Sequence, residues 1–430
     1  MASQPSPPAP APAPAQAAGA IDSPDMRHAG RDLLSLALID ARNHTLRLLS
    51  RYEQALGSPA LPLQPMEAIE PPRWLAGHIA WFAEWWIARN TQRAFGAECP
   101  VRPTRLAALE PQADGWWNPQ LRAPAQRWAN DLPDLGQTKT YLLEILETVL
   151  EMLDNAAPTD AGLYFYRLAL FHEDLRAEQL VVMAQTLGLP LGIEPLPAAA
   201  AREPLLLPAA RWRLGAAPTG FAFAQQSGAL EVELPPFEID AQPVSWQQFA
   251  EFVDDGGYDR SEFWSAEGWA WRESADRRAP RHVEQIGVAH GNSGGGGVLQ
   301  RRFGTVMRAA GVQPAVHLSW WEAEAWARWA GRRIATEVEW ELAAHTAARR
   351  GFRWGEVHER TAGTLRPWPG YRRDPWSAGG DFDPEPAFGQ ARVLRGASFA
   401  TRARLRWPQW RGFALPGRDD GFFGFRTCAV

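Results

Sequence analysis

The sequence predicts a protein in two parts, a four-helix bundle followed by an irregular domain of the α+β class. Three observations support this prediction. Up to residue 190, apolar residues recur at helical spacing in four long segments. A stretch rich in Pro and Ala, residues 189–204, then separates two regimes of composition. Beyond it the chain carries short strands, many Gly and Trp residues and only brief helical segments.

The boundaries of these parts follow from the same patterns. Residues 1–24 are almost entirely Ala, Pro, Ser and Gln, which bury too little apolar surface to offset the entropy of ordering, so we expect a disordered tail. We expect the bundle at 25–190, a linker at 191–210 and the α+β domain at 211–430. The four helices of the bundle are expected at residues 28–58, 74–95, 140–155 and 162–188.

The composition excludes several functional classes. The chain has 430 residues, with 44 Lys and Arg against 49 Asp and Glu, whereas a dedicated nucleic-acid binder carries a basic excess. No run of about 18 apolar residues is available to span a membrane. The N-terminus lacks the basic and apolar regions of a secretory signal, and the two cysteines, Cys99 and Cys428, are typical of a reducing compartment. We therefore expect a cytoplasmic protein that binds neither nucleic acid nor a membrane.

Two histidines lie on different helices of the expected bundle. His78 belongs to the second helix and His172 to the fourth. Side chains that project inward from facing helices form metal sites in the cores of bundles. Two imidazoles and one further ligand would leave positions open for a substrate and O2, which suits a non-heme Fe(II) site. The alternative is that both are structural histidines of a bundle that binds no metal.

The residues alone do not supply a third ligand. The residue four positions after His172 shares its helix face, and this residue is Arg176, which stays protonated and does not bind a cation. Glu173, Asp174 and Glu178 are close in sequence but are rotated off that face. The pattern therefore gives two candidate ligands and an unfilled third position.

Several motifs in the C-terminal half identify a known domain. They are QPVSWQQFAEFVDDGGY (242–258), QPAVHLSWWEAEAWARWAGRRIATEVEWELAAH (313–345), RVLRGASFATR (392–402) and GFFGFRTC (421–428). In order and spacing they resemble the formylglycine-generating-enzyme (sulfatase-modifying factor) domain, which has an irregular, C-type-lectin-like fold. The formylglycine enzyme uses a pair of active-site cysteines, and this chain has no such pair.

Two motifs of the N-terminal half extend the resemblance to the whole chain after the tail. They are PPRWLAGHIAWFAEWW (71–86) and LALFHEDLRAEQL (168–180), which resemble the metal-bearing helices of a DinB-like four-helix bundle. A DinB-like bundle followed by a formylglycine-generating-enzyme-like domain resembles the ergothioneine sulfoxide synthase group, which includes selenoneine synthase.

The resemblance implies a non-heme iron oxidoreductase with Fe(II) as cofactor and O2 as co-substrate. Such enzymes join the sulfur or selenium of a small molecule to the imidazole ring of hercynine, a trimethylated histidine. Three histidines bind iron in the family; His78 and His172 match two of them, and Arg176 stands in the place of the third. The resemblance also makes Asp420 a substrate-binding residue and Tyr371 the nearest candidate for the catalytic tyrosine.

Two questions stay open at the level of the sequence. Arg176 is compatible with an active enzyme that uses a substitute ligand such as Glu178, with an iron-free paralogue that binds hercynine or a sugar without catalysis, and with a sequence change at a working site. The donor could be a selenosugar, cysteine or γ-glutamylcysteine. The segments ARNHTLR (41–47) and LALFHED (168–174) are more similar to selenoneine synthase, which favours the selenosugar.

Overall fold

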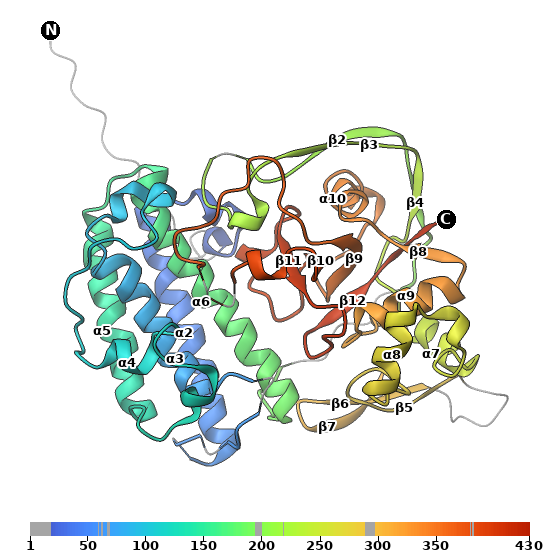
Figure 1. Ribbon diagram of the computed structural model, residues 1–430, viewed down its shortest axis with the longest axis horizontal. Helices are drawn as coiled ribbons and strands as arrows, with labels where there is room; N and C mark the ends of the chain where they lie inside the picture. Colours follow the sequence, from blue (N-terminus) through green and yellow to red (C-terminus); the bar gives the residue numbers. More distant parts are fainter. Residues whose placement is uncertain are drawn as a thin grey trace, which may run out of the picture.

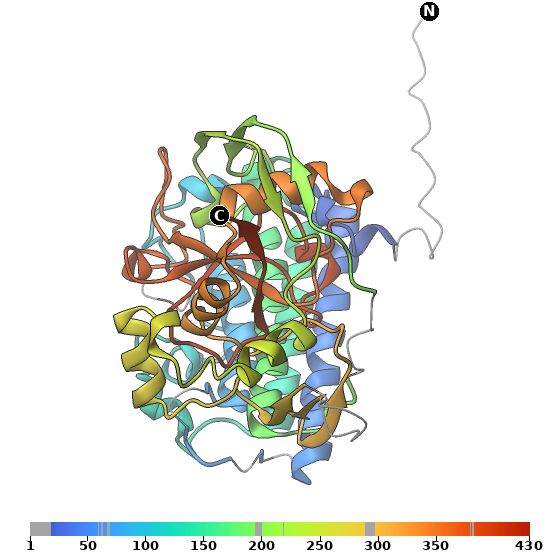
Figure 2. The same ribbon diagram turned by 90° about the vertical axis from the view of Figure 1, so that its right-hand side faces the viewer.

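One long helix, α6 (Asp160–Leu187), separates the helical part of the protein from the part built of sheets (Figure 1). The computed structural model describes residues 19–430 except 59, 62, 67–68, 194–199, 218, 289–296, 379 and 381. On one side of α6 lie the other long helices, α2 (Arg31–Leu56), α3 (Pro72–Ala83) and α5 (Leu135–Asp154). In the view of Figure 2 the C-terminal part faces the viewer and these helices lie behind it.

Helices are found in all four segments predicted from the sequence, and local signals set their ends. The side chain of Asp134 accepts a hydrogen bond from the backbone N–H of Gln137 at the start of α5, and Thr159 caps α6 in the same way. At their C-terminal ends, α2 stops at Gly57 and α6 stops at Gly188, and both glycines adopt the left-handed conformation that terminates helices.

The second helix ends earlier than predicted and changes its geometry. After Ala83 it continues as one π-helical turn, Glu84–Ala88, in which the N–H of Arg89 bonds to the carbonyl of Glu84. A π-turn inserts one extra residue and rotates the side chains that follow around the helix axis. In this turn the ring of Trp86 stacks on Phe165 of α6, and the guanidinium of Arg105 lies over the ring of Trp85.

Among its described residues, the C-terminal part contains four small sheets joined by loops and short helices. Their strand orders are β1-β4-β13-β8, β11-β10-β9-β12, β2-β3 and β5-β6-β7. The strands are β1 (Leu205–Leu207), β2 (Ala210–Leu214), β3 (Leu230–Leu234), β4 (Phe237–Ile239), β5 (Val283–Gly287), β6 (Gly297–Arg302), β7 (Thr305–Ala309), β8 (Arg332–Ile334), β9 (His358–Thr364), β10 (Arg392–Gly396), β11 (Arg411–Ala414), β12 (Phe423–Phe425) and β13 (Thr427–Ala429). Because β1 pairs with β4, residues 205–207 of the predicted linker belong to a sheet. The mixture of short helices and sheets confirms the α+β character expected of this part.

Short helices flank these sheets. They are α7 (Trp246–Asp254), α8 (Ala266–Ser274), α9 (Trp320–Trp329) and α10 (Glu337–Thr346). Both α9 and α10 begin with a capping box, formed by Ser319 with Glu322 and by Thr336 with Glu339. The short helix α4 (Ala113–Trp117) belongs instead to the long connection between α3 and α5.

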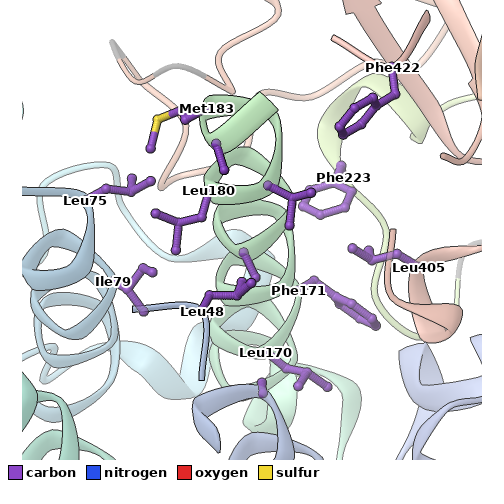
Figure 3. Close-up of a cluster of buried hydrophobic side chains, with 14 of the residues drawn as sticks. Leu48, Leu75, Ile79, Leu170, Phe171, Leu180, Met183, Phe223, Leu405 and Phe422 are labelled. Carbon is purple, nitrogen blue, oxygen red and sulfur yellow. The ribbon is translucent and has the colours of Figure 1, made fainter. Parts of the chain in front are cut away.

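The two parts share a hydrophobic core across α6. The cluster drawn in Figure 3 joins Leu75 and Ile79 of α3 to Leu180 of α6, and it continues to Leu405 and Phe422 of the C-terminal part. Burial on nearly every face of α6 follows from this position between two layers. Because the helix lies in the middle of the molecule, apolar residues occur on all of its faces, and its sequence is only weakly amphipathic.

The end of the N-terminal tail corrects one expectation. Residues 1–18 lie outside the described residues, so the disorder expected of them stays a prediction. Ile21, however, accepts a hydrogen bond from Arg404 through its carbonyl, and a short 3-10 helix begins at Pro24. Ordered structure thus starts before residue 25, because this segment packs on the C-terminal part. In the described part of the chain, every helix is too short or too polar to cross a bilayer.

Candidate functional site

A cavity of about 460 Å³ lies between the bundle and the C-terminal part. Its walls come from α3 and its π-turn, the connection that contains α4, helix α6 and the loop that follows residue 372. The aromatic lining residues are Trp81, Phe82, Trp85, Trp86, Trp376 and Phe382. The polar lining residues are His78, Arg102, Arg105, Asn118, Gln120, His172, Arg176, Arg373 and Ser377. A concave, largely aromatic site with a few polar groups is the usual form of a small-molecule site.

His78 reaches this cavity from α3 in a fixed orientation. Its Nδ1 lies 3.0 Å from the carbonyl oxygen of Trp117, which only accepts hydrogen bonds, so Nδ1 carries the proton. Its ring also stacks on Trp74 with 4.8 Å between centroids. The other nitrogen, Nε2, therefore presents a lone pair, as a metal ligand would.

His172 reaches the same cavity from α6. Its ring stacks on Phe82 with 3.7 Å between centroids and lies 5.6 Å from the ring of His78. Burial lowers the pKa of His172 well below its ordinary value, and the charge of Arg176 adds to this effect. The structure thus brings together the two histidines that the sequence selected, and it keeps His172 neutral.

The side chain of Arg176 lies between these two imidazoles. Its Nε donates a hydrogen bond to Nε2 of His172 at 3.3 Å, and its Nη2 lies 3.4 Å from Nε2 of His78. Its Nη1 donates to Oε1 of Gln179 at 2.8 Å, and its Cζ lies 4.6 Å from the ring centre of Phe382. A guanidinium thus occupies the place toward which both imidazole lone pairs point.

The residues at this place do not fit a three-ligand iron site. Across the described residues, no group of three His, Cys, Asp or Glu side chains is arranged to hold a metal ion. Arginine carries a permanent positive charge and has no lone pair for a metal. The disagreement with the ligand set implied by the resemblance is therefore local, and it concerns one position of the cluster.

Comparisons with known proteins agree with this architecture. The sulfatase-modifying factor enzyme 1-like domain matches residues 193–379. The hercynine oxygenase of Mycolicibacterium smegmatis is 30% identical over 455 residues, which cover 93% of this chain and 99% of the relative. The chain belongs to the hercynine oxygenase family. The hercynine oxygenase of Mycobacterium tuberculosis is 28% identical, and the alignment covers 92% of this chain and 98% of that relative.

A further relative is similar to this hercynine oxygenase family member over part of the chain. The formylglycine-generating enzyme of Thermomonospora curvata is 32% identical over 184 residues, which cover 40% of the chain and 58% of that enzyme. These results confirm the resemblance to the ergothioneine sulfoxide synthase group. They also confirm the prediction that the protein is an enzyme of that group.

Glu178, considered as a substitute ligand, faces away from the two histidines. Its carboxylate accepts hydrogen bonds from Ser398 at 2.5 Å and from Thr401 at 2.8 Å, and it lies 2.8 Å from Nε2 of His358. These three partners belong to the C-terminal part. Glu178 therefore fastens α6 to that part and is not in a position to replace the missing ligand.

The other two acidic residues near His172 are also held in ion pairs. Glu173 forms a bidentate pair with Arg42 of α2, and Asp174 forms one with Arg404 of the C-terminal part. One pair fastens α6 to the bundle and the other fastens it to the sheets. The ion pairs of Glu173 and Asp174 therefore hold α6 in position between the two parts.

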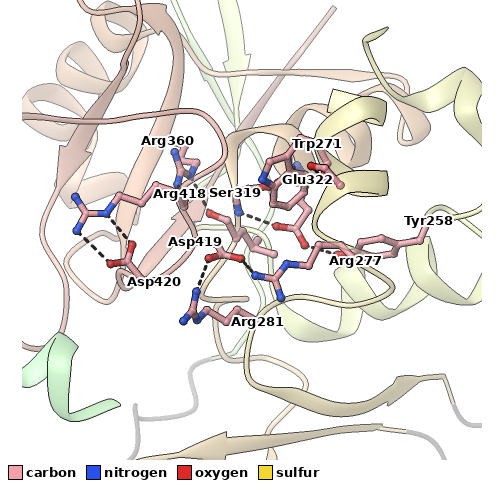
Figure 4. Close-up of polar contacts among 12 residues, drawn as sticks. Tyr258, Trp271, Arg277, Arg281, Ser319, Glu322, Arg360, Arg418, Asp419 and Asp420 are labelled. Carbon is pink, nitrogen blue, oxygen red and sulfur yellow. Dashed lines mark hydrogen bonds and ion pairs between the residues drawn. The ribbon is translucent and has the colours of Figure 1, made fainter. Parts of the chain in front are cut away.

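Asp420 and Tyr371 do not line the cavity of this family member. Asp420 pairs with Arg418, with 2.7 Å between Oδ1 and Nε, in a charged cluster that also contains Asp419 and Arg281 (Figure 4). Tyr371 packs edge-on against Phe388, and burial raises its pKa. Their assigned roles in substrate binding and catalysis stay predictions, and both would require these residues to approach the cavity.

Sequence reasoning missed the loop that does reach the cavity. Trp376 and Phe382 complete its aromatic wall, and Trp376 lies edge-on to Phe82 of α3. The segment around 371–388 has no helical or strand periodicity, and only its aromatic residues and glycines distinguish it. A buried loop of this kind gives no local signal of which side chain points inward, because the partner surface decides it.

Asp374 of the same loop gives a pH-dependent prediction. Burial raises its pKa to about 7, although Tyr164 and the N–H of Ala224 donate hydrogen bonds to it. The folded protein therefore holds a proton here between about pH 4 and 7 that the unfolded chain releases, so stability falls as pH rises through this window. We expect Asp374→Asn to remove a slope of up to about 1.4 kcal/mol per pH unit. Urea unfolding of both proteins at several pH values measures it, and parallel pH profiles would contradict the prediction.

Proposed function

We propose that the cavity binds hercynine and that the protein joins hercynine oxidatively to a sulfur or selenium donor, with O2 as co-substrate. The observation that carries this proposal is the aromatic cavity between the two parts of the chain, into which His78 and His172 project. Relatives aligned over nearly the whole chain are named hercynine oxygenase. The family relationship and the form of the cavity thus point to the same substrate.

The lining of the cavity suits the chemistry of hercynine. This molecule carries a quaternary ammonium group, a carboxylate and an imidazole ring. Aromatic rings attract quaternary ammonium groups, and Trp81 and Trp376 line the cavity. Trp85 lines it too, but the guanidinium groups of Arg89 and Arg105 already lie over its ring. Arginine side chains suit carboxylates, and Arg105 and Arg373 lie on the wall.

The finer assignments belong to the same proposal. We propose that the donor is a selenosugar, supported by the segments 41–47 and 168–174, and that a thiol such as γ-glutamylcysteine is the competing donor. We further propose that the bundle is DinB-like and the C-terminal part C-type-lectin-like. Fe(II) would supply activation of O2 in such an enzyme. Because Arg176 occupies the third ligand position, we derive no step through iron.

A second candidate function rests on Arg176. Its guanidinium bonds to both imidazoles, which favours a protein that binds hercynine or a sugar without iron and without turnover. The two candidates share the cavity and the ligand, and they differ in turnover. Anaerobic incubation with Fe(II), hercynine and a seleno- or thio-donor, followed by O2 and mass analysis of the product, separates them.

Hercynine binding is tested directly by calorimetry. We expect Trp376→Ala to weaken the binding of hercynine about tenfold, because it removes one aromatic face of the cavity. Trp269→Ala is the matched control, since Trp269 lies on α8 outside the cavity and should leave the affinity unchanged. Absence of heat with the unchanged protein, or equal loss in both variants, would contradict the assignment of the cavity.

A further inference from the structure

We propose that the guanidinium of Arg176 is a built-in cation that occupies the metal position of this site, so that a divalent metal binds only by displacing it. The proposal concerns the three side chains of the cluster, His78, His172 and Arg176. It holds whichever ligand fills the rest of the cavity, and it therefore stands apart from the assignment of hercynine.

The first argument is the use of the imidazole lone pairs. The proton of His78 is on Nδ1, where the carbonyl of Trp117 accepts it, so Nε2 faces the guanidinium as an acceptor. Nε2 of His172 accepts from Nε of the same arginine. A metal would need both of these lone pairs, because ligand nitrogens bind metals through them.

The second argument is space. The two guanidinium nitrogens lie 3.3 and 3.4 Å from the two imidazole nitrogens. A metal bound to imidazole lies about 2.1 Å from the nitrogen, along the direction of the lone pair. At that distance it would lie much closer to the guanidinium nitrogens than van der Waals contact allows. Metal and guanidinium therefore exclude each other sterically as well as by like charge.

The third argument is that Arg176 is held in place. Its side chain is almost fully buried, and Gln179 accepts a further hydrogen bond from Nη1 at 2.8 Å. The ring of Phe382 lies under the guanidinium at a distance suited to a cation–π contact. Displacement of the guanidinium would break these contacts together with both hydrogen bonds to imidazole. The site therefore holds the guanidinium of Arg176 through several contacts, as it would hold a bound cation.

The test measures metal binding in a series of substitutions at this position, with Co(II) as the probe, calorimetry for affinity and visible absorption for coordination. Arg176→Lys keeps a cation, Arg176→Met removes the charge without adding a ligand, and Arg176→His adds a third imidazole one turn from His172. We expect Co(II) to bind most weakly to the unchanged protein and to Arg176→Lys. Arg176→Met should bind more tightly than either.

Arg176→His is expected to bind Co(II) at least about 100-fold more tightly than the unchanged protein, since changes outside the ligand set alone alter metal affinity roughly 10- to 100-fold. His78→Ala in the background of Arg176→His should abolish the gain, which places the metal in this cavity. Circular dichroism and the midpoint of thermal unfolding, both measured with a chelator present, verify that each metal-free variant is folded.

Two results would overturn the proposal. One is Co(II) binding to the unchanged protein with the affinity and spectrum of Arg176→His. The other is that Arg176→Met binds Co(II) no better than Arg176→Lys. The weak metal binding of the unchanged protein would then be caused by the missing third ligand alone, and not by the positive charge at position 176. Calorimetry of hercynine with the same metal-free proteins is scored separately, since a failure there would contradict the proposed function and leave the metal result standing.

Discussion

Arg404→Ala is expected to lower the free energy of unfolding by about 3–5 kcal/mol, because it leaves a buried carboxylate without its partner. Arg404 is fully buried, and its Nε and Nη2 donate to the two oxygens of Asp174 on α6 at 2.6 and 2.9 Å. Its Nη1 also reaches Asp40 of α2 at 3.0 Å. Burial already raises the pKa of Asp174 with Arg404 in place.

Urea unfolding at pH 7 measures this loss, and a double substitution identifies its cause. If the unpaired carboxylate is responsible, Arg404→Met combined with Asp174→Asn should be less destabilised than Arg404→Met alone. Arg211→Ala is the surface control, since Arg211 pairs with Glu231 where both side chains are exposed, and a change of at most about 0.5 kcal/mol is expected. Equal effects of Arg404→Ala and Arg211→Ala would refute this account of the contact between bundle and sheets.

Gly77→Ala is expected to destabilise the protein by about 1–3 kcal/mol and to disturb the cavity as well. A Cβ at position 77 would overlap the indole ring of Trp117, which is buried and stacks on Tyr141. The carbonyl of Trp117 also orients His78 through its Nδ1. A displaced Trp117 therefore changes the direction of the Nε2 lone pair of His78.

Gly115→Ala supplies the matched control for this substitution. Gly115 also lies in a helix, α4, but a Cβ there meets nothing within 4 Å. Alanine favours helix over glycine by about 1 kcal/mol, so Gly115→Ala should leave stability unchanged or raise it slightly. Thermal unfolding and hercynine calorimetry are run on both variants. The same melting temperature and affinity in both would show that Trp117 has room to move.

The helical part of the fold could be predicted because its signals are local. Apolar spacing and end signals such as Gly57 and Gly188 mark α2 and α6. Both helices lie where the sequence predicts them. The convergence of His78 and His172 was also predictable, since a bundle brings inward-facing residues of different helices together. The π-turn at Glu84–Ala88 was not, because its register depends on packing against neighbouring segments.

The rest of the site depends on contacts between segments far apart in the chain. Trp376 reaches the cavity only because its loop lies against α3. The contacts of Glu178 with His358 and Ser398 likewise span the boundary between the two parts, so its orientation away from the histidines was not evident from helical spacing. The sequence alone shows that Arg176 departs from the three-histidine ligand set of the family. The structure adds that its guanidinium bonds to both imidazoles.

The shared position of α6 has a consequence for how the chain unfolds. Because this helix contributes side chains to the bundle and to the largest cluster of the C-terminal part at once, neither part buries all of its apolar surface without the other. We expect one cooperative transition in calorimetry and no separately melting domain. A fragment cut at the Pro/Ala-rich stretch, residues 189–204, would leave one side of α6 exposed to solvent and prone to aggregate. Co-expression of the two fragments should restore solubility, since each supplies the surface that the other lacks.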